Sequence, residues 1–90
     1  MRIRRSNLDI CATILDTIAK EERAIAKTQI MYRANISFSQ LQNYLSLLLE
    51  LDLIKELKQE DRVTYEVTEK GKVLLKSYQK VKELMTTTRK

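Results

Sequence analysis

The sequence predicts a mainly α-helical domain with one small β-hairpin, a fold of the α+β class. Two patterns predict it: apolar residues recur every three to four positions along most of the chain, and they alternate every two positions between residues 53 and 67. A chain of 90 residues is long enough for one small domain and too short for two. We therefore expect several helices and one hairpin around a single hydrophobic core.

The first helix is predicted to begin near Asn7 and to end at about Lys20. Ser6 or Asn7 offers an N-cap, because a short polar side chain can accept a hydrogen bond from the first turn. Cys11 lies in the middle of the apolar stripe, so we expect a small buried side chain and not a nucleophile. The apolar residues at helical spacing are Leu8, Cys11, Ile14, Leu15, Ile18 and Ala19.

A short strand and a second, brief helix are expected next. Residues 21–23 form a polar break, and the apolar segment 24–26 suits a minimal strand. Thr28 can cap a helix that ends at Asn35, a residue that tolerates the left-handed conformation at a helix end.

The third predicted helix, residues 37–51, is the one that suggests a function. Ser37 and Gln40 form a capping box at its start. One face is apolar and should be buried, and it carries Phe38, Leu41, Tyr44, Leu45, Leu48 and Leu51. The opposite face carries Ser39, Gln42, Asn43 and Ser46. Amides offer the paired donors and acceptors that match base edges in a DNA groove, so we interpret this as a DNA-reading helix in a helix-turn-helix.

Alternating residues 53–58 and 63–67 predict a β-hairpin with a polar connection at 59–62. An isolated two-stranded ribbon is marginal, so the hairpin should pack on the helices and could gain a third strand from residues 24–26. Thr68 then offers an N-cap for a last helix, and residues 86–90 are expected to form a loose basic tail.

The last helix has apolar residues spaced alternately three and four apart, as in a coiled-coil seam. An apolar seam left in water favours aggregation, so we expect a homodimer through this helix. The alternative is that the helix folds back on its own core, because two and a half heptads make a short coiled coil. The predicted dimer interface consists of Leu74, Leu75, Tyr78, Val81 and Met85.

The amino-acid composition favours some classes of function and argues against others. The formal net charge of +5 suits a polyanionic partner, although it is also ordinary for a protein. The absence of His, with one Gly and one Cys, leaves no material for a His and Cys metal site, a Gly-rich phosphate loop or a His-assisted nucleophile. We expect no enzyme activity, no cofactor and no small-molecule ligand. The single Cys and the lack of a long apolar run predict a cytoplasmic protein that does not bind membranes. DNA as its partner would make it nucleoid-associated.

Two stretches carry a resemblance to a known family. Residues 27–38 read Lys-Thr-Gln-Ile-Met-Tyr-Arg-Ala-Asn-Ile-Ser-Phe, and residues 65–71 read Tyr-Glu-Val-Thr-Glu-Lys-Gly. Together with the leucines between them, they resemble the small archaeal winged helix-turn-helix DNA-binding proteins, over about residues 8–78.

The resemblance implies a recognition helix at 37–46 and a wing tip at 58–62. It also implies pairing through the C-terminal helix, often as an antiparallel coiled coil, and a role as a regulator or a chromatin-associated protein. Tyr32 and Tyr44 match family positions that we interpret as packing residues. We divide the chain into a winged helix-turn-helix domain, 1–68, and a dimerisation helix with tail, 69–90, within one structural unit.

Our leading hypothesis is sequence-selective binding of double-stranded DNA by a dimeric transcription regulator. The alternatives are an architectural protein that binds DNA without sequence choice and a winged-helix module that binds a protein. The predicted base-reading residues are Ser39, Gln40, Gln42 and Asn43. The predicted phosphate-binding residues are Arg4, Arg5, Lys27, Thr28, Arg33, Ser37, Lys55, Lys58 and Arg62.

Overall fold

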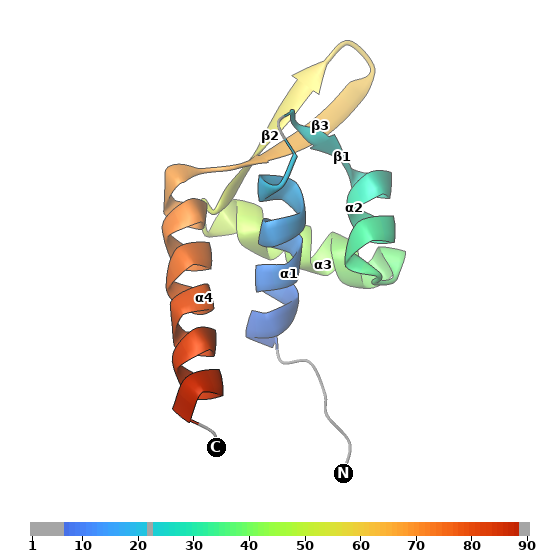
Figure 1. The fold of residues 1–90 in the computed structure, drawn as a ribbon. Coiled ribbons are helices and arrows are strands. Elements are labelled where there is room, and N and C mark those ends of the chain that lie inside the picture. Colours follow the sequence, from blue (N-terminus) through green and yellow to red (C-terminus); the bar gives the residue numbers. More distant parts are fainter. Residues whose placement is uncertain (1–6, 22, 89–90) are drawn as a thin grey trace.

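The described residues, 7–21 and 23–88 of a computed structural model, form helices and strands in the predicted order (Figure 1). The helices are α1 (Asn7–Ala19), α2 (Lys27–Ala34), α3 (Phe38–Glu50) and α4 (Glu69–Thr88). The strands are β1 (Ile25–Ala26), β2 (Ile54–Gln59) and β3 (Arg62–Val67). This is the predicted fold class, mostly helical with a small antiparallel sheet.

The sheet has the strand order β1-β3-β2, with antiparallel neighbours. Ile25 pairs with Tyr65, so β1 supplies the predicted third strand. Gln59 pairs with Arg62, which leaves only the residues at 60 and 61 in the turn, two fewer than the polar connection we expected. The hairpin therefore stays regular almost to its tip.

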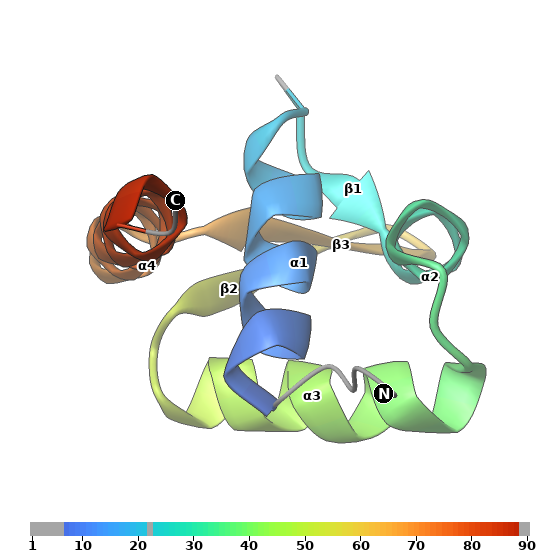
Figure 2. The ribbon, with the colours of Figure 1, turned by 60° about the horizontal axis from the view of Figure 1, so that its bottom comes forward.

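Helix α1 lies at the centre of the molecule. Figure 2 shows it between α4 and α2, with α3 crossing beneath it. Ile14 and Leu15 are fully buried, as are Ile30 of α2 and Leu48 of α3, so the helices share one core. Cys11 is buried as predicted, and burial raises the pKa of its thiol, which therefore stays protonated at neutral pH.

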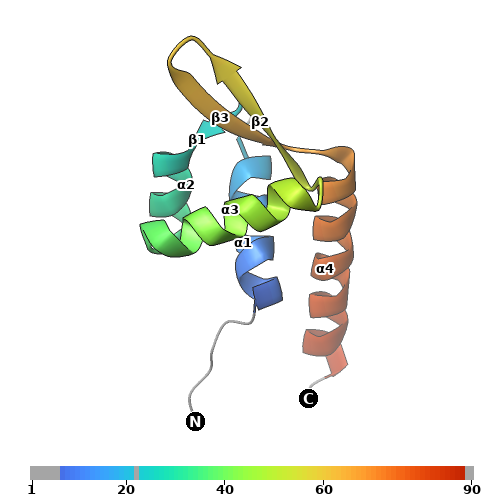
Figure 3. The same ribbon diagram turned by 180° about the vertical axis from the view of Figure 1, so that it is seen from behind.

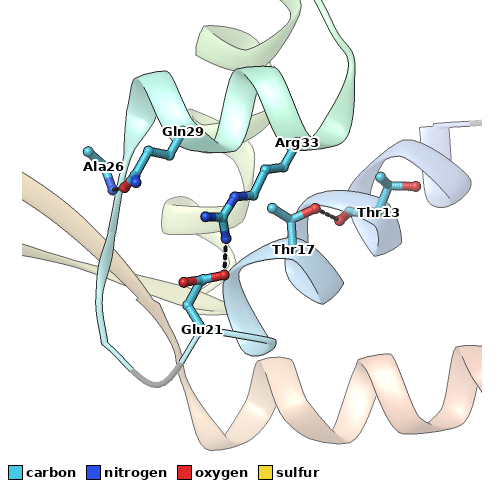
Figure 4. A network of polar contacts seen from close by, with 6 residues as sticks. All are labelled: Thr13, Thr17, Glu21, Ala26, Gln29 and Arg33. Atoms are coloured by element: carbon cyan, nitrogen blue, oxygen red, sulfur yellow. Dashed lines mark hydrogen bonds and ion pairs between the residues drawn. The ribbon is translucent and has the colours of Figure 1, made fainter.

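The turn between α2 and α3 has the predicted chemistry. Asn35 adopts the left-handed conformation with φ 57°, and its N–H donates to the Met31 carbonyl. Ser37 caps α3, because its hydroxyl oxygen accepts a hydrogen bond of 3.2 Å from the Gln40 N–H. The predicted cap at Thr28 is wrong. The N-cap position is Ala26, two residues earlier, and Gln29 Oε1 accepts a hydrogen bond from the Ala26 N–H, as Figure 4 shows.

The end of α3 and the start of α4 meet at a junction that we call the Gly71 joint, formed by Asp52, Leu53, Thr68 and Gly71. Thr68 caps α4 as predicted, since its hydroxyl accepts from the Gly71 N–H at 3.0 Å, and it also donates to the Asp52 carbonyl at 2.7 Å. The Thr68 N–H donates to the Leu53 carbonyl at 3.0 Å. A Cβ at Gly71 would lie 2.1 Å from that same oxygen, so only glycine allows this approach.

Three expectations about burial and helix length are wrong, and one residue of the predicted dimer interface lies in the core. Phe38 is 56% exposed and Leu51 is 46% exposed, although both fall on the apolar side of the helical wheel. Phe38 is in the first turn of α3, where there is no earlier turn for its side chain to cover, and Leu51 is already the C-cap. Helix α4 continues through the expected tail to Thr88, because no Gly or Pro follows Met85 to end it. Leu75 belongs to the core of its own chain.

Candidate nucleic-acid interface

One side of α3 is exposed and polar. Leu41, Leu45 and Leu48 point into the core, which places the opposite side of the helix in solvent. We call this side the polar face of α3; it consists of Ser39, Gln42, Asn43 and Ser46, all exposed, and Gln40 is exposed beside it. Figure 3 shows α3 on the outside of the molecule, where a partner can reach it. The structure therefore brings the predicted base-reading residues onto one accessible surface.

Lys27 brings a positive charge to this face. It is the first residue of α2, and its Nζ donates a hydrogen bond to Gln42 Oε1. The same ammonium lies 5.4 Å from the centroid of the Phe38 ring. Because Phe38 and Gln42 are four residues apart on α3, Lys27 lies along the surface of the first helical turn. The helix has no Lys or Arg of its own, so this contact from α2 supplies its charge.

Arg33 is engaged elsewhere. Its guanidinium forms an ion pair with Glu21, which follows α1, and Figure 4 shows this pair between α2 and the end of α1. The Arg33 side chain is 47% exposed, so the pair is in contact with solvent. A phosphate would therefore compete with Glu21 for Arg33, which makes this residue a weaker candidate than its sequence position indicated.

The predicted wing, the β2–β3 hairpin, divides its cations between two faces. Side chains alternate along a strand, so Lys58 shares a face with buried Ile54, on the side where the helices pack. Lys55 and Arg62 lie on the other face, and Lys55 pairs with Glu66 across the strands at 3.5 Å. Of these three predicted phosphate contacts, Lys58 is the one on the same side as α3.

Of the four remaining predicted phosphate contacts, the structure describes Thr28 and Ser37. Thr28 is exposed in the first turn of α2. The hydroxyl of Ser37 is occupied as the cap of α3. Arg4 and Arg5 lie outside the described residues.

Sequence reasoning missed two exposed aromatic side chains, one on α2 and one on α3. Tyr32 of α2, which we interpreted as a packing residue, is 75% exposed. Phe38 is the second, and its position directly after an N-cap is the signal that could have indicated exposure. Tyr44 does pack against the core, and its hydroxyl also donates to Asn7 Oδ1 at 2.7 Å, which ties α3 to the start of α1.

A second surface lies between the start of α1 and the later turns of α4. The first half of α4 packs on the core through Leu75, with Leu74 and Tyr78 half-buried, and the Tyr78 hydroxyl donates to Asp9 of α1. Beyond this point Val81 is 55% exposed. We call the resulting hollow of about 410 Å³ the apolar groove; its apolar lining is Leu8, Leu74, Tyr78, Val81 and Met85. The first half of α4 thus packs back on the core of its own chain, and the second half carries an exposed apolar strip.

Between residues 7 and 88, residue 22 aside, no helix is long and apolar enough to cross a membrane. Within the same part of the chain, no three His, Cys, Asp or Glu side chains are grouped so that they could hold a metal ion.

Comparison with known proteins agrees with this geometry. The uncharacterized protein MJ0287 of Methanocaldococcus jannaschii is 33% identical over 86 residues, which cover 96% of this chain and 82% of that protein. Sso10a-2, a DNA-binding protein from Sulfolobus solfataricus, has a similar crystal structure, with a TM-score of 0.75 and 28% identity over 94% of this chain and 90% of that one.

MepR, a transcription regulator of the Staphylococcus aureus multidrug efflux pump MepA, has the same fold. Its TM-score is 0.77 at 18% identity, over 92% of this chain and 62% of that one. The model of the family described as winged helix-turn-helix matches residues 4–86. The chain therefore belongs to the winged helix-turn-helix family.

Proposed function

We propose that this protein is a transcription regulator that binds double-stranded DNA sequence-selectively, as a dimer, with α3 in the major groove. The observation that carries the proposal is the exposed polar face of α3, whose amides and hydroxyls are accessible while Leu41, Leu45 and Leu48 hold the opposite side of the helix in the core. Side chains of this kind hydrogen-bond to base edges, and a helix fits the width of the major groove. The similarity to Sso10a-2 supports DNA as the partner.

Lys27, Thr28 and Lys58 are the best placed of the predicted phosphate contacts. Lys27 and Thr28 begin α2 beside the polar face, and Lys58 lies on the helix side of the hairpin. The tip of the hairpin carries the exposed acids Glu60 and Asp61, which repel phosphates, so we expect the wing to contact DNA through Lys58 and not through its tip. A protein with these contacts would act on the chromosome, in the cytoplasm.

We assign dimerisation to the apolar groove. Its exposed apolar residues are Leu8, Val81 and Met85, from two helices. Burying such a strip against a second copy removes apolar surface from water. This burial stabilises the dimer by about 25 cal/mol for each Å² of apolar surface. Leu75 is removed from the interface that we predicted, because it is only 9% exposed and already lies in the core.

A second candidate is sequence-independent, architectural DNA binding. It is favoured by the exposed lysines Lys72, Lys76 and Lys80, which are four residues apart and so form one stripe along α4. Binding through such a stripe depends on charge and shape and not on base edges.

One experiment separates the two candidates. Bound duplexes are selected from a random pool at two salt concentrations, while sedimentation gives the oligomeric state. A recurring sequence motif supports the regulator, and its absence together with tight, strongly salt-dependent binding supports the architectural protein. No duplex binding at low salt would contradict both and favour a protein-interaction module.

Replacing Asn43 with alanine should relax base preference. Asn43 is exposed in the middle of the polar face, and loss of a bidentate amide contact costs roughly 1–3 kcal/mol of discrimination at one base pair. The measurement is the affinity ratio between the selected duplex and a random one. Gln79→Ala, which removes an exposed amide from α4, is the matched control and should leave the ratio unchanged. An unchanged ratio for Asn43→Ala would show that this residue does not read bases.

A further inference from the structure

The contact between Lys27 and Gln42 fixes which way the Gln42 amide points. Lys27 Nζ can only donate, so the amide oxygen of Gln42 must face it as the acceptor. The amide NH₂ group then points away from Lys27. Phe38 keeps Lys27 in place, because the ammonium lies 5.4 Å from the centroid of its ring.

This orientation changes what Gln42 offers to a base. A free glutamine presents one donor and one acceptor side by side, the pattern that pairs with the N6 and N7 atoms of adenine. Here the acceptor is turned to Lys27, and what remains outward is the NH₂ group of Gln42 together with the other N–H groups of the Lys27 ammonium. The pair therefore presents donors only.

We propose that Lys27 and Gln42 together select guanine in the major groove. The inference rests on the proposed function, sequence-selective reading by α3. Guanine presents two acceptors there, O6 and N7, which match a surface of donors. Adenine presents the N6 amino group in place of O6, and this donor would face the ammonium of Lys27. Lys27 acts on Gln42 as a positioning residue and also contributes its own charge.

The second lone pair of the Gln42 oxygen does not restore adenine binding. An amide oxygen can accept two hydrogen bonds, so geometry alone would allow one from adenine N6. That amino group carries partial positive charge, however, and it would have to come close to the Lys27 ammonium, which repels it. Guanine O6 carries partial negative charge and is attracted by the same ammonium. The charge of Lys27 and the hydrogen-bond pattern therefore both favour guanine over adenine.

The test is selection of duplexes from a random pool by the wild-type protein and by three variants. Gln42→Ala identifies the base pair that Gln42 contacts, because the variant loses base preference at that one position of the motif. Lys27→Met removes the ammonium but keeps the aliphatic stem beside Phe38, so the amide is free to pair with adenine. Lys70→Met removes one exposed lysine from α4, outside the stripe of Lys72, Lys76 and Lys80, and is the control for charge. Thermal melting by circular dichroism checks that each variant is folded.

We expect guanine at the Gln42 position for the wild-type protein and for Lys70→Met. For Lys27→Met, the ratio of guanine to adenine at that position should fall on the order of tenfold, toward adenine. Adenine in the wild-type motif, or guanine retained at full strength in Lys27→Met, would overturn the inference and leave the proposed function intact. Duplex binding without any motif for the wild-type protein would instead overturn the proposed function, and this inference with it.

Discussion

Gly71→Ala is expected to destabilise the domain by about 2–3 kcal/mol, the upper part of the range of about 1–3 kcal/mol that is usual for overpacking a close contact. An added Cβ would lie 2.1 Å from the Leu53 carbonyl oxygen and 2.7 Å from Val67 Cγ1. The first of these atoms is backbone, so no rotamer change relieves the clash, and α4 or β2 must move. Alanine is the better helix former by about 1 kcal/mol, but that gain is smaller than the cost of the displacement. Thermal unfolding should show the midpoint lowered by roughly 10–20 °C.

Gln79→Ala is the control for Gly71→Ala, since it places alanine at an exposed site of the same helix. It should leave the midpoint within a few degrees of the wild-type value, because exposed substitutions change stability by about 0.5 kcal/mol or less. Equal stability of Gly71→Ala and the wild type would contradict the close packing of the Gly71 joint.

Val81→Glu should convert the proposed dimer to a monomer. Val81 is 55% exposed in a single chain, so the domain itself can accommodate a carboxylate. In the dimer the same carboxylate would be taken out of water among the apolar residues of the groove, whose lining also includes Lys82, and we expect a cost of about 3 kcal/mol, which weakens association about a hundredfold. Sedimentation equilibrium at several protein concentrations measures the dissociation constant directly.

Gln79→Glu adds the same negative charge on α4 away from the groove and should remain dimeric. Circular dichroism should show both variants folded. A Val81→Glu protein that sediments like the wild-type dimer would place the interface on another surface, and a monomeric wild-type protein would contradict dimerisation itself.

Periodic segments were predicted well because their signal is local. The apolar spacing of α1 and α3, the alternation in β2 and β3, and the caps at Ser37 and Thr68 each depend on residues within a few positions of one another. The predictions of burial were wrong where a periodic segment ends. Phe38 and Leu51 continue the apolar stripe of α3 at its two termini, where no neighbouring turn covers them, and a helical wheel takes no account of helix ends.

The candidate site was predicted only in part, because its electrostatics depend on contacts between distant residues. The polar face of α3 follows from the sequence of one helix. The contacts that Lys27 and Arg33 make do not follow from local sequence. Lys27 and its partner Gln42 are 15 residues apart, and Arg33 and its partner Glu21 are 12 residues apart. Only the position of α2, with Lys27 against α3 and Arg33 against the end of α1, decides that one of these cations lies on the polar face and the other is neutralised. Local patterns contain no information on that choice.

The Gly71 joint has a geometric consequence for the proposed dimer. It ties the end of α3 to the start of α4 through backbone contacts, so each reading helix is held at a fixed angle to the helix that pairs. B-DNA presents the same groove to one side about every 34 Å, and two readers must match that repeat to bind together. The joint, far from any base, would then set the spacing of the two half-sites, and related chains could change the length of their operators by altering it while their base-reading residues stay the same.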